Sequence, residues 1–168
     1  MWQKTVCAEH FASKIGRLIA RGRKSARILG WLAGVIFHQG GNISTVLAGT
    51  TVKPVTDKHG ISHEELAYIV DSTASPVATI LPFNAWPAYV SGLVVATIPV
   101  IATEADAFRM FFSSIIFNFY GLVALVMTFL FAAGWLPWLG KKMARARQRA
   151  LDTGALDAPE AKPILPPK

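Results

Sequence analysis

Apolar residues are gathered into three long stretches separated by polar or charged segments. The stretches occupy residues 28–52, 76–102 and 110–138. Each is long enough for a helix to cross a membrane, which takes about 20 apolar residues. The pattern predicts an all-α integral membrane protein with its membrane domain at residues 28–139 and flanking segments at 1–27 and 140–168. Residues 53–75, between the first two stretches, are predicted to form a loop and a helix.

The first apolar stretch is interrupted at its centre by Phe37-His38-Gln39-Gly40-Gly41-Asn42. Glycine pairs break helices and permit tight turns. The interruption predicts two half-helices, residues 28–37 and 43–52, that enter the membrane and return as a re-entrant helical hairpin. Asn42 is a suitable N-cap for the second half-helix, and Ser44 and Thr45 lie in its first turn. The free amide groups of that turn would form a partly positive end at membrane depth.

The charge distribution favours a hairpin over a full crossing. The formal net charge of +7 is concentrated in one basic block at residues 14–27 and another at 141–149. Basic segments favour the cytoplasmic side of a membrane. A hairpin places both blocks and the lysines of residues 53–58 on that side, whereas three crossings would separate the blocks. The acidic connection at residues 103–109 then faces outward, and both termini are expected in the cytoplasm.

The two flanking segments differ in pattern. Residues 10–27 place apolar side chains at helical spacing with basic residues on the other face. This pattern is typical of a helix on the cytoplasmic membrane surface, and the alternative is a solvated linker helix. After the second basic block, the tail from Gly154 is rich in proline and alanine and is expected to be disordered.

A second polar segment, Asp71-Ser72-Thr73-Ala74-Ser75-Pro76, lies between a predicted helix and the second apolar stretch. Ser62 and Glu65 have the spacing of a capping box, so that helix is expected to begin at this point. Pro76 cannot donate a backbone hydrogen bond and biases the preceding serine away from helix, so a break is predicted. A carboxylate, hydroxyl groups and freed carbonyls are costly in a membrane unless an ion or polar substrate uses them.

The two breaks are predicted to face each other and to form an ion or substrate site. The candidate ligands are polar side chains at the breaks and one amide between two prolines: Asp71, Ser72, Thr73, Ser75, Asn42, Ser44, Thr45, Asn84, His38 and Gln39. Oxygen ligands suit a hard cation such as Na⁺, and Asp71 is the candidate metal ligand. A cation and a proton bound at Asp71 would exclude each other, which is the mechanism of antiport. The alternatives are a helix-cap role for Asp71 and an interhelical hydrogen bond for Asn84.

Other classes of function find little support in the sequence. Cys7 is the only cysteine, which excludes a disulfide framework and a thiolate metal site. His59, His63 and Glu64 do not match the spacing of a zinc site or of a metalloprotease helix. The aromatic residues lie in the apolar stretches rather than among the basic residues, which argues against nucleic-acid binding. We expect no enzymatic activity and no resident cofactor, with Na⁺ and H⁺ only as transported ions.

One long run of the sequence is similar to a known family. The matching words are Lys53-Pro54-Val55-Thr56-Asp57, then Ile61-Ser62-His63-Glu64-Glu65-Leu66-Ala67-Tyr68-Ile69-Val70-Asp71-Ser72-Thr73-Ala74-Ser75-Pro76-Val77-Ala78, then Pro82 and Trp86. They resemble the NhaC family of Na⁺/H⁺ antiporters within the ion-transporter superfamily. The resemblance implies an inverted-repeat transporter fold, secondary active transport by cation/proton antiport, and a multi-pass location in the plasma membrane of a bacterium.

The sequence departs from the family pattern in two ways, and these departures leave functions other than cation/proton antiport open. The family usually places two carboxylates where this chain has His38 and Gln39. A histidine could titrate in their place or bind another substrate, so a related organic-anion or amino-acid exchanger is the alternative. The chain also covers roughly a third to a half of a family member, and such a transporter needs both halves for its midplane site. The expected partners are the lipid bilayer and either a second copy, in a homo-oligomer, or a complementary transporter half. The rival is a truncated membrane protein that does not transport.

Overall fold

The computed structural model describes residues 22–38, 41–97, 101–136 and 140–161, which form helices and no strand. The elements are α2 (Arg23–Ile36), α3 (Gly41–Lys58), α4 (His63–Ile80), α5 (Ala85–Thr97), α6 (Glu104–Ser114), the short 3₁₀ helix η2 (Ile115–Phe117), α7 (Phe119–Ala133) and α8 (Gly140–Asp152). The all-α fold class expected from the sequence is therefore confirmed. Most of the predicted amphipathic segment and the end of the tail lie outside the described residues.

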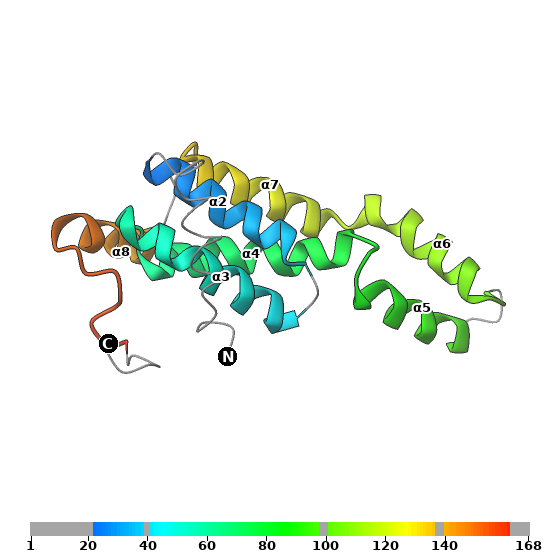
Figure 1. Ribbon diagram of the computed structural model, residues 1–168. Helices are drawn as coiled ribbons and strands as arrows, with labels where there is room; N and C mark the ends of the chain where they lie inside the picture. The colour runs from blue at the N-terminus through cyan, green and yellow to red at the C-terminus, as the bar shows by residue number, and fades with distance from the viewer. Residues whose placement is uncertain (1–21, 39–40, 98–100, 137–139, 162–168) are drawn as a thin grey trace.

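Helix α4 is the centre of the fold. Helices α2, α3 and α7 pack along it, α8 contacts it, and α5 follows its end. Helices α5 and α6 pair with each other and form a hairpin that projects beyond the other helices (Figure 1). The apolar core between α2, α3 and α4 consists of Ala26, Leu29, Ala33, Ala48, Val52, Val55, Ile61, Leu66 and Val70. A second cluster, with Ile69, Phe131 and Ala132, joins α4 to α7.

Helices α2 and α4 approach each other closely at Gly34. A Cβ atom added at Gly34 would lie 2.8 Å from the Cβ of Thr73, too close for any real side chain. Thr73 is fully buried there, and its hydroxyl donates to the carbonyl of Ile69 at 2.6 Å. Small residues allow helix backbones to come together in this way. Gly34 therefore sets the distance between α2 and the middle of α4.

The predicted break in the first apolar stretch is confirmed. Helix α2 ends at Ile36 and α3 begins at Gly41, and the two helices pack against each other as a hairpin. The glycine pair expected to cause the break lies at this turn, although residues 39 and 40 are outside the described part of the chain. Asn42 lies inside the first turn of α3 rather than before it.

The second half of the hairpin is longer than expected. Helix α3 does not end near residue 52 but continues through Pro54 to Lys58, so the predicted loop is mostly helical. The extra turn buries Val55, while the proline ring lies on the exposed side of the helix. Gly60, with φ of 64°, supplies the left-handed conformation that commonly ends a helix.

The predicted break at Asp71–Pro76 is wrong, because α4 runs without interruption through Pro76 to Ile80. A proline inside a helix leaves the carbonyl four residues earlier without its usual partner. Here that carbonyl belongs to Ser72, and the buried hydroxyl of Thr128 on α7 lies 3.3 Å from it. The same hydroxyl lies 2.6 Å from the carbonyl of Ala124 on its own helix, so its single hydrogen is shared between the two carbonyls. The neighbouring helix therefore offers Ser72 a long, shared contact in place of the hydrogen bond that the proline removes.

The break in this region occurs one turn later, between Ile80 and Ala85. The side-chain amide of Asn84 donates to the carbonyls of Ala78 and Leu81 at 2.9 and 2.8 Å, and its oxygen accepts from the amide of Trp86 at 2.8 Å. Asn84 thus satisfies backbone groups on both sides of the break. The sequence predicted a broken helix here, but the position of the break is different.

The third apolar stretch is bent rather than straight. Helix α6 begins at Glu104, before the expected start of the span, and α7 ends at Ala133, before its expected end. The two helices meet at Asn118, whose side-chain oxygen accepts from the amide of Gly121 at 3.0 Å. Its amide nitrogen donates to the hydroxyl of Thr79 on α4 at 2.9 Å. Asn118 therefore caps α7 and ties the bend to the central helix.

The C-terminal region differs from the expected disordered tail. The basic block forms α8, and the segment that follows, residues 153–161, returns to the start of α4. The amide of His63 donates to the carbonyl of Leu156 at 3.0 Å. Backbone and side-chain contacts with α4 hold this segment in place, and composition alone did not indicate them.

Candidate functional site

Asp71 lies on the face of α4 that the other helices leave uncovered. Tyr68, Asp71 and Ser75 are all exposed, and their spacing of three and four residues places them on one side of the helix. Asp71 and Ser75 make no hydrogen bond or ion pair within the described residues. The strip carries a carboxylate, a hydroxyl and a phenol, which could bind a cation or contact another protein surface.

The two hydroxyl residues next to Asp71 point elsewhere. Ser72 is half-buried and offers its carbonyl to Thr128, and Thr73 is buried against α2 on the opposite side of the helix. Asp71 and Ser75 therefore share a face, and Thr73 does not. Consecutive positions in a helix diverge by about 100°, so continuous helix through Pro76 separates residues that a broken chain would have grouped.

The candidate ligands at the tip of the α2–α3 hairpin lie around its turn. His38 is half-buried just after α2, with its Nδ1 atom 2.9 Å from the carbonyl of Val35. Ser44 is buried in the first turn of α3, and Thr45 beside it is half-buried. Gln39 and the side chain of Asn42 lie outside the described part of the chain.

Within the described residues, no hydrogen bond joins Asp71 to His38 or Thr45. Helices α2 and α3 both pack against α4, so the hairpin and the central helix are neighbours. The remaining candidate ligand, the Asn84 amide, is used in the local contacts at the α4–α5 break. The candidate ligands thus lie at three places in one bundle, which are the α2–α3 turn, α4 and the α4–α5 break.

A buried charge cluster, which the sequence analysis missed, lies at the start of α4. Glu65 is fully buried, and its Oε1 atom accepts from Arg27 at 3.2 Å and from Arg147 Nε at 3.0 Å. Arg23 Nη2 lies 3.7 Å from Glu65 Oε2. One carboxylate from α4 thus faces two arginines of α2 and one of α8. We call Arg23, Arg27, Glu65 and Arg147 the arginine cluster.

The arginine cluster is a charged contact with little access to water. Burial lowers the pKa of Arg27, and the adjacent Glu65 carboxylate opposes that shift. Arg27 Nε and Glu65 Oε2 are buried without a hydrogen-bond partner among the described residues. A carboxylate this deeply buried is tolerated only when cations compensate it. The cluster therefore joins three helices at one end of the bundle.

The sequence contained a signal for this cluster. Glu65 was assigned to a capping box, and Ser62 does accept from the amide of Glu65 at 3.3 Å. The Glu65 side chain instead turns toward the arginines, which had been assigned to membrane flanks as a group. A carboxylate between two basic blocks in a chain with few acidic residues could have suggested a specific pairing.

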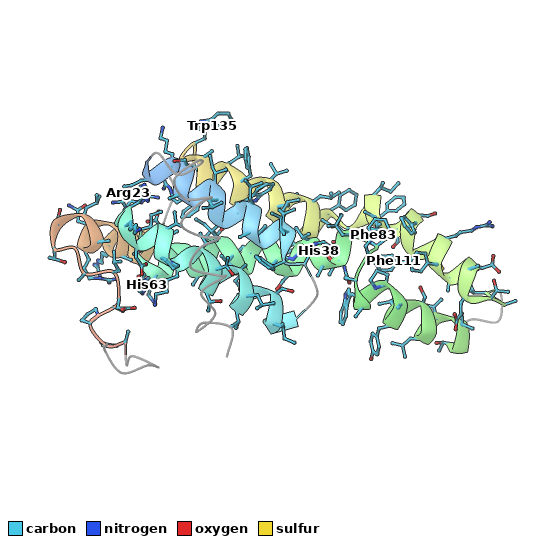
Figure 2. All side chains as sticks on the ribbon, viewed as in Figure 1. Arg23, His38, His63, Phe83, Phe111 and Trp135 are labelled. Atoms are coloured by element: carbon cyan, nitrogen blue, oxygen red, sulfur yellow. The ribbon has the colours of Figure 1, made fainter. Side chains whose placement is uncertain are left out.

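Large apolar side chains are exposed over much of the surface. They include Phe83 with 83% of its surface exposed, and they are frequent along α5, α6, η2 and α7: Trp86, Tyr89, Leu93, Met110, Phe112, Ile116, Phe117, Phe119, Tyr120, Val123, Val126 and Phe129. Phe83 and Phe111 lie near the α5–α6 hairpin, far from Arg23 and His63 at the other end (Figure 2). An apolar surface of this extent marks contact with another protein or with lipid.

The length and apolar character of each helix can be compared with what a membrane crossing requires. In the described part of the chain, no single helix combines the length and apolar character needed to cross a membrane. Two pairs of consecutive helices, each pair bent at a short break, meet the requirement when the two helices of a pair are counted as one span. They are His63–Ile80 with Ala85–Val95, bent by 45°, and Glu104–Phe117 with Phe119–Ala133, bent by 51°.

The fold and its polar regions define a class: an all-helical protein built on a central helix, with an exposed polar strip and an extensive apolar surface. Comparison with known proteins adds one relative. A Haemophilus influenzae protein described as uncharacterized is 29% identical over 113 residues, which are 67% of this chain and 22% of the relative. The chain thus spans about a fifth of that protein's length. No known protein family and no solved structure matches the chain.

Proposed function

We propose that this chain forms part of a membrane-embedded secondary transporter that exchanges a cation for protons. The observation that carries the proposal is the α2–α3 hairpin. Its two outer ends lie at the end of the bundle occupied by α8, and its tip stops short of the far end formed by the α5–α6 hairpin (Figure 1). This is the shape of a segment that enters a membrane and returns on the same side.

The charges at the two ends support this orientation. The α8 end carries exposed basic residues, Lys24, Lys53, Lys58, Lys141, Lys142 and Arg145. The tip of the α5–α6 hairpin carries Glu104 and Asp106, both exposed. Basic residues favour the cytoplasmic side, so a bacterial plasma membrane would surround the apolar surface between the two ends.

Asp71 is the proposed exchange group. A carboxylate on an uncovered helix face can hold a cation or a proton but not both, which couples the two flows. Ser75, one turn further along the same face, would supply a second oxygen. The remaining ligands would come from a second copy or from a complementary transporter half. The match to about a fifth of a longer relative favours such a partner.

The first test is transport by the chain in liposomes with a pH-sensitive dye inside. Pulses of Na⁺, Li⁺ or K⁺ outside are expected to raise the internal pH, because inward cation flow is exchanged for outward proton flow, and Asp71→Asn is expected to abolish the response. Asp152→Asn removes the same charge from an exposed position on α8 and should leave the response intact. If folded, inserted protein gives no cation-driven pH change, cation/proton antiport by this chain alone or as a homo-oligomer is excluded.

The same liposomes distinguish the alternative substrates. Loading them with an unlabelled organic anion or amino acid and adding the labelled form outside measures exchange directly. The presence of His38 where the family pattern has a carboxylate favours including these substrates. Uptake that depends on His38 but not on a cation pulse would replace antiport by exchange. A chain that transports neither class would be a non-transporting membrane protein.

A further inference from the structure

The segment after α8 is fastened to the start of α4 by a compact set of contacts. Arg149 Nη2 lies 2.7 Å from Glu64 Oε1, and it also donates to the carbonyl of Leu156 at 3.4 Å. Arg149 Nε donates to the carbonyl of Ala155 at 3.2 Å. These contacts bring residues 155–157 beside the His63 side chain, which belongs to the first turn of α4.

The imidazole ring of His63 lies between two carboxylates. Its Nε2 atom is 3.0 Å from Asp57 Oδ1, near the end of α3, and its Nδ1 atom is 2.5 Å from Asp157 Oδ1. Only a protonated imidazole has an N–H group on both nitrogens. A neutral ring can donate to one carboxylate and then turns an acceptor lone pair toward the other. Both contacts together therefore require the charged form of His63.

The charged groups around His63 and Asp157 influence the pH range in which His63 contacts both Asp57 and Asp157. Glu64 adds a third carboxylate, and Lys53 and Arg149 supply positive charge near Asp157. The hydrogen bond from His63 lowers the pKa of Asp157, although burial opposes the shift. A lowered carboxyl pKa means that Asp157 supports docking above its ordinary pKa and stops doing so as the pH falls through the lower value. Loss of the His63 ring proton leaves a donor for only one of the two carboxylates, so docking weakens on the alkaline side.

We propose that His63 is a proton-operated latch that holds the C-terminal segment, residues 153–161, against the corner between α3 and α4. In the latched state the imidazolium ring joins Asp57 to Asp157. Loss of the ring proton leaves two carboxylates facing a ring that can satisfy only one, and the segment is released. Because α8 immediately precedes this segment, release also removes one of the restraints that keep α8 on α4. The proposal depends on these contacts and not on transport.

Distances between two spin labels measure the state of the latch. In a Cys7→Ser background, exposed Ala67 on α4 and exposed Ala161 are replaced by cysteines and labelled. We expect a narrow distance distribution at pH 6 and a broad, longer one at pH 8.5. A single proton changes the docked-to-released ratio by up to about tenfold for each pH unit. Circular dichroism at both pH values establishes that the helices remain folded.

Three variants make the test specific. His63→Gln should remove the pH dependence, whereas His59→Gln should retain it, because among the described residues the His59 ring hydrogen-bonds only the carbonyl of Val55, at 2.8 Å. Asp57→Asn should keep the segment docked at alkaline pH, since the asparagine amide can donate to the ring while the ring donates to Asp157. An unchanged distribution in the parent protein between pH 6 and 8.5, or pH dependence that survives in His63→Gln, overturns the proposal.

Discussion

At the scale of single residues, Glu65 has the most demanding environment in the described chain. It is fully buried, and guanidinium groups from two other helices compensate its charge. The net contribution of such a buried ion cluster to the free energy of folding is small, because the cost of desolvating the charges offsets their attraction. Removal of one member is costly, since the remaining charges then stay buried without compensation.

Glu65→Gln should therefore lower the free energy of unfolding by about 3 kcal/mol or more. The substitution keeps the size and shape of the side chain but leaves Arg27 and Arg147 without a carboxylate. Denaturant unfolding followed by circular dichroism, in the detergent that keeps the chain folded, measures the change.

The neighbouring residue provides a matched control. Glu64 pairs with Arg149 but its side chain is 34% exposed, so Glu64→Gln should cost about 1 kcal/mol or less. Equal losses for the two variants would contradict the view that burial makes the Glu65 contact important.

At the scale of helices, the sequence predicted what depends on local pattern and missed what depends on neighbours. The break between α2 and α3 was predictable because a glycine pair and polar residues interrupt an apolar stretch at that point. The continuity of α4 through Pro76 was not, since it relies on the hydroxyl of Thr128 from a helix more than fifty residues later. Local rules treat the Ser72 carbonyl as free, and the fold supplies its partner.

The candidate site also has a part that local sequence pattern predicts and a part that depends on neighbouring helices. Asp71 and Ser75 fall on one exposed face, as helical spacing alone would indicate. Thr73 does not share that face. The prediction grouped Thr73 with Asp71 because it assumed a broken chain, in which these side chains could converge. The Glu65–Arg147 and His63–Asp157 contacts join residues far apart in the sequence, so local pattern could suggest that Glu65 has a basic partner but not which arginine it would be.

Glycine substitutions test the close contact between α2 and α4. Gly34→Ala should destabilise the protein by about 1–3 kcal/mol, because the new methyl group collides with the buried Thr73 side chain. Gly49→Ala, in α3, has no atom within 4 Å of the added carbon. It should stabilise the protein by about 0.5–1 kcal/mol through the better helix propensity of alanine. Thermal or denaturant unfolding compares the two, and changes of the same sign would argue against the observed packing.

At the scale of the whole molecule, charge and apolar surface are arranged along one long axis. The exposed basic residues Lys24, Lys58 and Lys142 belong to the start of α2, the end of α3 and the start of α8, and the exposed acidic residues Glu104 and Asp106 belong to the start of α6. Figure 1 shows α8 and the α5–α6 hairpin at opposite ends of the molecule. The exposed apolar side chains lie on the elements between and around the tip. The proposed orientation of the protein in the membrane can therefore be tested by chemical labelling of residues at the two ends.

Single cysteines in a Cys7→Ser background test that orientation in bacterial cells. A membrane-impermeant maleimide should label Asp106→Cys from outside intact cells. Lys24→Cys and Lys142→Cys, both at exposed positions, should react only after permeabilisation, since the proposed re-entrant hairpin would keep both basic blocks on the cytoplasmic side. Labelling of Lys24→Cys and Lys142→Cys from opposite sides would show that the hairpin crosses the membrane instead of returning.

The arginine cluster also has a consequence for biosynthesis. Arg27 is already present when Glu65 is added to the growing chain, but Arg147 is added 82 residues later. At about 5–20 residues per second, roughly 4–16 s pass between these events. During that interval the carboxylate has only its α2 partners, and the start of α4 lacks the contact that closes it. Final closure of this end of the bundle must therefore wait for α8 to be synthesised, which leaves time for the chain to associate with a chaperone, a bilayer or a second subunit.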